Sequence, residues 1–525
     1  MASAPIEISL PGTPAAVSTR DRFFAATPAP SGLKKTAVRG VAVTFGSQLA
    51  QFGLGFVSTA ILARLLTPET FGLVAMTSVF TGFIWLFSDA GLAAATIQRE
   101  KITHEQVSCL LWVNVALGCG LALLLIAVAP WIAAFYGEPR LTGITRWIAV
   151  SFLIGGFTVQ HKALLRRQMR FTTIAVLDLV ALATGIAVGI GMACSGFGYW
   201  SLVGMSNATA VASLIAVWLL VPWRPGPPRR GAGVMPLLRF GKDIFSSNLF
   251  SYMARQADTL LIGWKAGPIA LGFYDKAYRM LLFPVRQFNQ PVGAVLLPAL
   301  SRLNGDPPRF ARFFLRAVEL LTGVTVPLVL GVCVFADEVV ALWLGAQWAE
   351  CAHLFRLLGA AAVIGVLSNP MSWLLTARGQ GRRYRKISLT TAVCYVGAFV
   401  IGLPHGAAGV ATAYSIAVAL LFLPVWCYSL RESPVRLTAL LRAFAPAVIA
   451  ATLAATAGRA ALHLLPDVFV TWGHAGITMI AVGAYALVYA VVLLVLFRRW
   501  SVYRAVLDDL KRSRAPKPGP ASAAG

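Results

Sequence analysis

Charged side chains are scarce in this sequence of 525 residues. Only 12% of the residues are Asp, Glu, Lys or Arg, whereas 58% are hydrophobic. A soluble chain normally carries roughly a quarter charged residues, because it must cover its surface with polar groups. The composition therefore excludes an ordinary soluble domain and indicates a chain that has lipid as its solvent.

Acidic residues are the scarcer sign of charge. The chain has 20 Asp and Glu against 45 Lys and Arg, which gives a formal net charge of +25. Such a charge on a soluble surface is typical of nucleic-acid binding. Here the basic residues gather in short clusters between apolar runs, without the interleaved aromatic side chains on which bases stack. The distribution argues against nucleic acid and is typical of charge that orients a membrane protein.

Signatures of catalysis are missing as well. The chain has no HExxH zinc pair, no GxSxG nucleophile elbow and no GxxxxGK[ST] phosphate loop. Its six histidines are scattered, and its seven cysteines show no CxxC spacing. We therefore expect no enzyme, no cofactor, no metal site and no disulfide framework.

The first 33 residues lack the features of a secretory signal. They are rich in Ala, Pro and Ser, without a basic start, an apolar core or a small-residue cleavage site. We expect residues 1–36 to form a disordered cytoplasmic tail.

Long apolar runs are abundant. A run of about 20 apolar residues can cross a bilayer as a helix. Six such runs precede the polar, Pro-rich and Arg-rich stretch 222–239, and eight follow it. They lie near residues 40–63, 70–91, 107–135, 144–160, 172–194, 198–221, 243–264, 271–299, 314–335, 354–375, 385–403, 406–428, 443–464 and 475–497. The pattern predicts an all-α integral membrane protein with about fourteen transmembrane helices.

These runs suggest a division of the chain into parts. The predicted parts are the tail at 1–36, an N-lobe of six spans at 37–221, a cytoplasmic linker at 222–240, a C-lobe of six spans at 241–428, two further spans within 429–500 and a cytoplasmic tail at 501–525.

Basic residues concentrate in alternate connections between the runs. The clusters are Lys34, Lys35 and Arg39; Lys162, Arg166, Arg167 and Arg170; Arg224, Arg229 and Arg230; Arg302, Arg309, Arg312 and Arg316; Arg378, Arg382, Arg383, Arg385 and Lys386; and Arg498, Arg499 and Arg504. The facing connections 194–198 and 404–406 carry no Lys or Arg, and a third is acidic through Asp337, Glu338 and Glu350. Because cytoplasmic loops carry the excess of basic residues, we predict a multi-pass inner-membrane protein with both termini in the cytoplasm.

The two halves share a weak internal repeat. At an offset of 200 residues the identities are Phe45 with Phe245, Ser47 with Ser247, Leu49 with Leu249, Thr59 with Thr259, Pro68 with Pro268 and Gly72 with Gly272. An even number of spans separates the copies, so both halves run in the same direction across the membrane. Two parallel-repeat lobes with a cavity between them are the predicted arrangement.

Charged residues inside the predicted spans are the main functional candidates, because each costs about 2.5–3.5 kcal/mol at the bilayer centre even on a lenient scale. Arg255 and Asp258 lie three residues apart in the seventh span, and Lys276, Arg279 and Arg286 follow one side of the eighth. Guanidinium groups present a planar fork of donors to phosphate. The three arginines, with Lys276, therefore predict a cavity site for an anion.

A structural interpretation of the same residues stays open. Asp275 has the spacing to pair with Arg279, and Lys276 with these two can extend to the outer interface. Arg255 and Asp258 can also form a pair between helices.

Carboxylates in or near the spans are candidates for coupling to an ion gradient. Asp258, Asp89, Asp178 and Glu319 are each able to exchange protons or bind sodium, and Asp258 is the best placed because it lies deepest. Pairing of interfacial carboxylates with loop arginines is the alternative.

Four stretches resemble a known family. They are Leu62–Gly72 (LARLLTPETFG), Phe87–Gln98 (FSDAGLAAATIQ), Asp258–Gly263 (DTLLIG) and Leu271–Arg302 (LGFYDKAYRMLLFPVRQFNQPVGAVLLPALSR). They are similar to the polysaccharide transporter branch, Wzx-like, of the multidrug/oligosaccharidyl-lipid/polysaccharide exporter superfamily. The likeness extends over most of residues 34–500.

The resemblance implies a fold and a function. The fold is a bundle of two six-helix lobes around a basic central cavity, with two peripheral C-terminal helices. The function is transfer of undecaprenyl-diphosphate-linked oligosaccharide from the cytoplasmic to the periplasmic leaflet, by alternating access coupled to an ion gradient. Partners would be that lipid-linked substrate, membrane lipids, a polysaccharide polymerase and a chain-length regulator. O-antigen, capsule and exopolysaccharide units all remain open as cargo.

Other functions are compatible with the same features. A lipid II flippase and a drug exporter have this architecture, although a drug exporter favours an acidic cavity for cationic drugs. A scaffold of a polysaccharide-synthesis complex would use its intramembrane charges for helix packing alone, and would tolerate their neutralisation.

Overall fold

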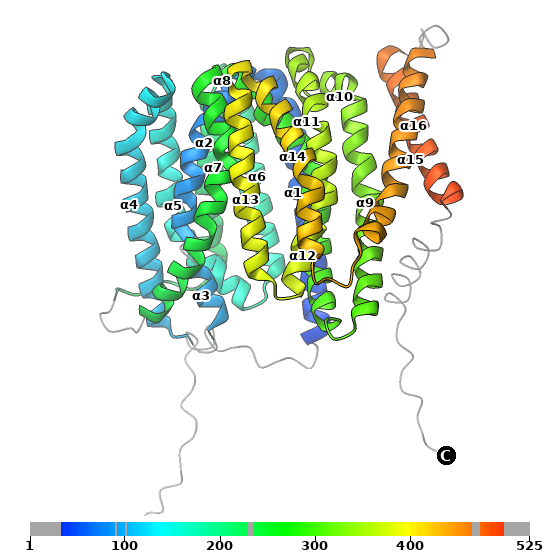
Figure 1. Ribbon diagram of the computed structural model, residues 1–525. Helices are drawn as coiled ribbons and strands as arrows, with labels where there is room; N and C mark the ends of the chain where they lie inside the picture. Colours follow the sequence, from blue (N-terminus) through cyan, green and yellow to red (C-terminus); the bar gives the residue numbers. More distant parts are fainter. Residues whose placement is uncertain (1–32, 90–91, 100–101, 229–234, 465–472, 498–525) are drawn as a thin grey trace, which may run out of the picture. The chain divides into compact units, whose positions relative to one another are not determined.

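The computed structural model describes residues 33–89, 92–99, 102–228, 235–464 and 473–497, and these are almost entirely helical (Figure 1). Within this part of the chain there are α-helices, short 3-10 and π segments, and no strand. The α-helices are α1 (Leu33–Leu65), α2 (Pro68–Asp89), α3 (Leu92–Gln98), α4 (His104–Tyr136), α5 (Arg140–Arg167), α6 (Phe171–Cys194), α7 (Trp200–Leu220), α8 (Met235–Arg302), α9 (Pro307–Val334), α10 (Ala336–Trp343), α11 (Ala349–Ser368), α12 (Pro370–Ala377), α13 (Gly381–Gly402), α14 (Gly406–Leu430), α15 (Leu437–Leu464) and α16 (Gly473–Val491). The predicted all-α class is confirmed.

The helices account for the predicted membrane spans. Among the described residues, ten stretches are long and apolar enough to cross a bilayer. One of them, Gly381–Leu430, holds both α13 and α14. Helix α2 and the two halves of α8 occupy the remaining predicted runs, at 70–91, 243–264 and 271–299. The chain is therefore a multi-pass membrane protein with about fourteen spans, as the apolar runs predict.

Helix α4 shows how the sequence sets a helix's ends. Its start is a capping box, in which the Gln106 N–H donates to Thr103 Oγ1 at 3.2 Å and the Thr103 N–H donates to Gln106 Oε1 at 3.3 Å. Its end is Gly137, which takes a left-handed φ of 67° and donates to the carbonyls of Ala133 and Ala134. Both caps satisfy backbone groups that the helix leaves unpaired.

Helix α8 is two spans joined at one glycine. Gly267 has φ 80° and ψ −178°, a conformation that is essentially open only to glycine. Pro268 follows it, and proline is favoured in the first turn of a helix. The chain turns back here, which places Tyr274 within hydrogen-bond reach of Asp258, sixteen residues earlier.

Contacts divide the chain into two units. Unit 1 is Met1–Leu66 with Met76–Met253, and unit 2 is Thr67–Ala75 with Ala254–Gly525. The start of α2 thus groups with unit 2 and its remainder with unit 1. The lobes predicted at 37–221 and 241–428 stay a prediction. The tail predicted at 501–525 and all but the last residues of the tail predicted at 1–36 lie outside the described residues.

Unit 1 is built around the helix pair α4 and α5. Gly118 and Gly156 let the two backbones approach, because a Cβ on Gly118 would lie 2.7 Å from the Phe152 carbonyl oxygen. The first part of the predicted linker is fixed to this unit. Trp223 is buried and donates from Nε1 to His104 Nδ1 at 3.1 Å, while Trp112 Nε1 donates to the Gly226 carbonyl at 2.8 Å.

In unit 2, helices α15 and α16 lie beside α9 (Figure 1). The hydroxyl of Tyr485 on α16 donates to the Pro327 carbonyl of α9 at 2.7 Å, and Tyr489 donates to the Gly323 carbonyl at 2.5 Å. Small residues of α15 such as Ala454, together with Ala481 and Phe335, fill the space around Tyr485. These contacts attach the last two spans to the unit.

Candidate functional site

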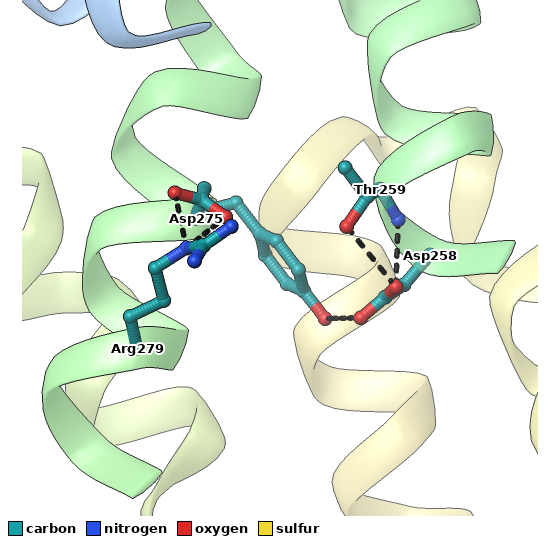
Figure 2. Close-up of polar contacts among 5 residues, drawn as sticks. Asp258, Thr259, Asp275 and Arg279 are labelled. Atoms are coloured by element: carbon teal, nitrogen blue, oxygen red, sulfur yellow. Dashed lines mark hydrogen bonds and ion pairs between the residues drawn. The ribbon is translucent and has the colours of Figure 1, made fainter. Parts of the chain in front are cut away.

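The side chain of Asp258 is buried in α8 of unit 2 and is held by three donors (Figure 2). The Thr259 N–H and hydroxyl lie 2.7 Å and 3.3 Å from Oδ1, and the Tyr274 hydroxyl donates to Oδ2 at 3.0 Å. Only 4% of Asp258 is exposed. A buried carboxylate is tolerated when hydrogen bonds replace its lost hydration, and this one is so compensated.

A series of tyrosines extends from Asp258. Tyr274 stacks on Tyr278 with ring centroids 5.9 Å apart, and Tyr278 is hydrogen-bonded to Tyr414 of α14. Tyr395 of α13 meets Tyr414 edge to face at 5.3 Å. A phenol hydroxyl both donates and accepts, and it is the Tyr274 hydroxyl that donates to the Asp258 carboxylate.

Asp275 and Arg279 form an ion pair on α8. The Arg279 Nε lies 2.7 Å and 2.8 Å from the two carboxylate oxygens of Asp275 (Figure 2). The arginine side chain is 58% exposed and that of the aspartate 15%. The four-residue spacing predicts this pair, and the structure confirms it.

Lys276 has a different neighbour, which the sequence analysis missed. Its Nζ lies 3.8 Å from the centroid of the Phe71 ring, a cation–π contact. Phe71 also meets Trp348 edge to face at 5.3 Å. Residues Thr67–Ala75 belong to the same unit as Lys276, so these contacts lie within unit 2.

The other predicted site residues are more dispersed. Arg255 and Arg286 on α8, and Asp89 on α2, have side chains outside the described part of the structure. Asp178 of α6 pairs with Lys162 of α5 at 2.9 Å in unit 1, and Glu319 is buried on α9 in unit 2. Asp258, Lys276 and Arg279 lie on turns of α8 that flank Gly267, and their partners differ: Tyr274, Phe71 and Asp275, respectively.

The sequence prediction lacked the aromatic residues of this site, Tyr274 and Phe71 among them. Tyr274 could have been found, because Gly267–Pro268 is a strong turn signal that folds the following helix back along Asp258. Phe71 carries no local signal, since its partner is distant in sequence. Groups of His, Cys, Asp and Glu suited to a metal ion do not occur among the described residues.

Ion pairs also occur between the spans. Between α4 and α5, Arg140 Nε donates to Glu138 at 2.7 Å, and this hydrogen bond holds the pKa of Glu138 below its usual range. Asp337 pairs with Arg356 at 2.7 Å, and Glu338 with Arg459 at 3.4 Å. The carboxylates of Asp337 and Glu338 in unit 2 are therefore each paired with an arginine.

Known proteins resemble the chain along most of its length. A family described as "Polysaccharide biosynthesis protein" matches residues 61–353, more than half of the chain. The succinoglycan biosynthesis transport protein ExoT of Rhizobium meliloti is 28% identical over 505 residues, which cover 93% of this chain and 98% of that protein. The lipopolysaccharide biosynthesis protein WzxC of Escherichia coli is 25% identical over 378 residues, covering 71% of this chain and 74% of that one.

Solved structures share the fold. The lipid II flippase MurJ in an inward closed conformation superposes with a TM-score of 0.69 at 14% identity, over 88% of this chain and 99% of that chain. An inward-facing multidrug transporter of the MOP superfamily gives a TM-score of 0.57 at 17% identity, over 75% and 96%. At these identities the likeness concerns the fold alone. The family match over residues 61–353 establishes that the chain belongs to the polysaccharide biosynthesis protein family.

Proposed function

We propose that this protein is a flippase that moves undecaprenyl-diphosphate-linked oligosaccharide from the cytoplasmic to the periplasmic leaflet of the bacterial inner membrane. The cargo would be a repeat unit of O-antigen, capsule or exopolysaccharide. The observation that carries the proposal is the match over nearly the whole chain to a protein named for succinoglycan transport. The protein's contribution is binding and movement, with no catalytic step and no cofactor.

The basic residues of α8 supply the headgroup site in this proposal. Arg255, Lys276, Arg279 and Arg286 would bind the diphosphate through charge-assisted hydrogen bonds. Arg279 is paired with Asp275 through its Nε. Arginine is well suited to this role because its planar fork matches two phosphate oxygens.

Asp258 would couple transport to an ion gradient. It is a buried carboxyl whose donors include a tyrosine, and further tyrosines adjoin that one. Binding and release of a proton or sodium there would favour different states during alternating access. Asp89, Asp178 and Glu319 are the other candidates for this role. Both termini would be cytoplasmic, and a polymerase and a chain-length regulator would receive the cargo.

The alternative functions become outcomes of the test. A lipid II flippase is supported only by a fold likeness at 14% identity. A drug exporter would need a cation-binding cavity, whereas α8 presents Lys276 and Arg279. A scaffold protein would tolerate neutralisation of these side chains.

The test replaces the basic residues in a strain that lacks its own flippase, and measures periplasmic exposure of lipid-linked oligosaccharide. We expect Arg279→Ala and Arg255→Ala each to lower exposure about tenfold or more, since a hydrogen bond to a charged group contributes about 1.5–3 kcal/mol. Membrane levels of the protein, measured in parallel, should stay near those of the parent.

Asp275→Asn is the matched control, because it breaks the same ion pair but keeps the arginine. An anion-binding role predicts that Asp275→Asn keeps most of the activity that Arg279→Ala loses. Equal losses in the two variants would assign Arg279 to structure. Full activity in all of the variants would contradict the proposed headgroup site and favour a scaffold.

A further inference from the structure

The repeat that the sequence indicates is also a contact in the structure. The offset of 200 relates Pro68 to Pro268 and Gly72 to Gly272. A Cβ built on Gly72 would lie 1.7 Å from the Pro268 carbonyl oxygen, and one built on Gly272 would lie 2.0 Å from the Pro68 carbonyl oxygen. Each glycine therefore faces the proline of the other copy, as two-fold-related segments do when they cross on their axis.

This crossing leaves no room for side chains. The atoms that a Cβ would meet are backbone atoms, which cannot rotate away as a flexible side chain can. Protein interiors already pack at crystal-like density, so the overlap must separate the two helices. Glycine at both positions is thus required for this conformation of α2 and α8.

Phe71, next to Gly72 in the chain, packs beside this crossing. The ring lies under the Lys276 ammonium at 3.8 Å and against the Trp348 ring at 5.3 Å, and Trp348 in turn meets Phe273 at 5.9 Å. Trp348 is fully buried and Phe71 is nearly so. In this conformation the Phe71 ring covers one side of the Lys276 ammonium, which belongs to the proposed headgroup site.

The contacts of α2 change along its length. Residues Thr67–Ala75 group with unit 2, whereas α2 from Met76 onward groups with unit 1. The crossing is therefore where one continuous helix passes from one unit to the other.

We propose that residues Thr67–Ala75 form a releasable lock on α8, which covers Lys276 in the locked state and exposes its ammonium to an anionic diphosphate headgroup when it leaves. This inference rests on the proposed function, which supplies the anion. A charge-assisted hydrogen bond to phosphate is stronger than a cation–π contact, so the headgroup would displace the ring. Binding of cargo and release of the lock would then favour one another.

Cys351 is a native reporter for the lock. It is fully buried beside this cluster, and its Sγ donates to the Phe273 carbonyl at 3.3 Å. A chain that keeps only this cysteine is obtained by replacing Cys109, Cys119, Cys194, Cys333, Cys394 and Cys427. The rate at which a maleimide modifies Cys351 in the purified full chain then reports opening, independently of transport.

We expect Gly72→Ala and Gly272→Ala each to speed modification of Cys351 about tenfold or more, since overpacking of this kind shifts an equilibrium by that order. The double variant should be little faster than either single one, because both changes act on one crossing. Gly365→Ala is the matched control, with nothing within 4 Å of its added Cβ, and should leave the rate unchanged. Folded variants with the parent's rate would overturn the lock.

Phe71→Leu tests the cover on Lys276 without adding atoms at the crossing. The probe is undecaprenyl diphosphate in detergent. We expect Phe71→Leu to bind the probe several-fold more tightly than the parent. Without the aromatic ring over the Lys276 ammonium, a larger fraction of the protein is already in the binding-competent state. Adding Lys276→Met should remove this gain.

The two proposals can fail separately. Faster modification of Cys351 in Phe71→Leu without any binding of the probe would support the lock and contradict the proposed anion. Probe binding that is the same in parent and Phe71→Leu, at an unchanged rate of Cys351 modification, would overturn the lock and leave the proposed function standing.

Discussion

At the scale of the residue, Asp258 is defined by its partners. Its oxygens receive two bonds from Thr259 and one from Tyr274, and only the last comes from another turn of the fold. Loss of one donor to a buried charged acceptor costs about 1–3 kcal/mol. We expect Tyr274→Phe to lower the free energy of unfolding by that amount, measured by thermal unfolding in detergent.

Asp258→Asn separates a structural role from coupling. An amide keeps the shape of the side chain but cannot take up a proton or balance a sodium charge. We expect export into membrane vesicles to stop responding to an imposed proton or sodium gradient, while the protein level stays near the parent's. Tyr274→Phe, which keeps the carboxyl, should retain a gradient response. A response that persists in Asp258→Asn would exclude this residue from coupling.

The sequence predicts residue contacts only where both partners share an element. Asp275 and Arg279 are four apart on one helix, and their ion pair is foreseeable from that spacing. The contact of Lys276 with Phe71 depends on a crossing of distant segments, which no helical periodicity encodes. Charge alone therefore identifies candidate residues but not what they touch.

At the scale of the element, Gly267 determines how α8 folds back. Its conformation places Tyr274 beside Asp258, and a side chain there costs about 1–3 kcal/mol. We expect Gly267→Ala to lower the thermal unfolding midpoint. The effect should be non-additive with Tyr274→Phe, because the first change already displaces the hydroxyl.

Gly397→Ala on α13 is the control for this prediction. A Cβ at Gly397 meets nothing within 4 Å, and alanine is favoured over glycine in a helix by about 1 kcal/mol. Its unfolding midpoint should be unchanged or slightly raised. Equal stability of the two alanine variants would contradict a strained turn at Gly267.

Elements are predictable from this sequence because lipid imposes long apolar runs on every span. The break between the runs at 243–264 and 271–299 coincides with Gly267. The hydropathy of the run at 354–375 does not show the division into α11 and α12; the signal is the pair Asn369–Pro370, where the division falls. The short helices α3 and α10 are likewise too brief for periodicity to reveal.

At the scale of the whole molecule, the sequence predicts the orientation of the protein in the membrane. Basic clusters lie in alternate connections, and the predicted outer connections hold the acids Glu138, Asp337 and Glu338. Arginines near these acids, Arg140, Arg356 and Arg459, are each paired with one of them. Compensated arginines on the outer side are compatible with an excess of basic residues in the cytoplasm.

Fusions to truncated chains test this orientation directly. We expect alkaline phosphatase to be active when fused after Gly345, in the connection that follows α10, because the basic clusters predict that this connection lies outside. Green fluorescent protein should be fluorescent after Arg302 and after Gly379, because these connections carry or adjoin basic clusters that retain them in the cytoplasm. The opposite pattern of phosphatase activity and fluorescence would show that the protein has the inverted orientation in the membrane. The lock at Thr67–Ala75 would then face the cytoplasm, and its opening would accompany binding of the cargo from the cytoplasm rather than release of the cargo outside.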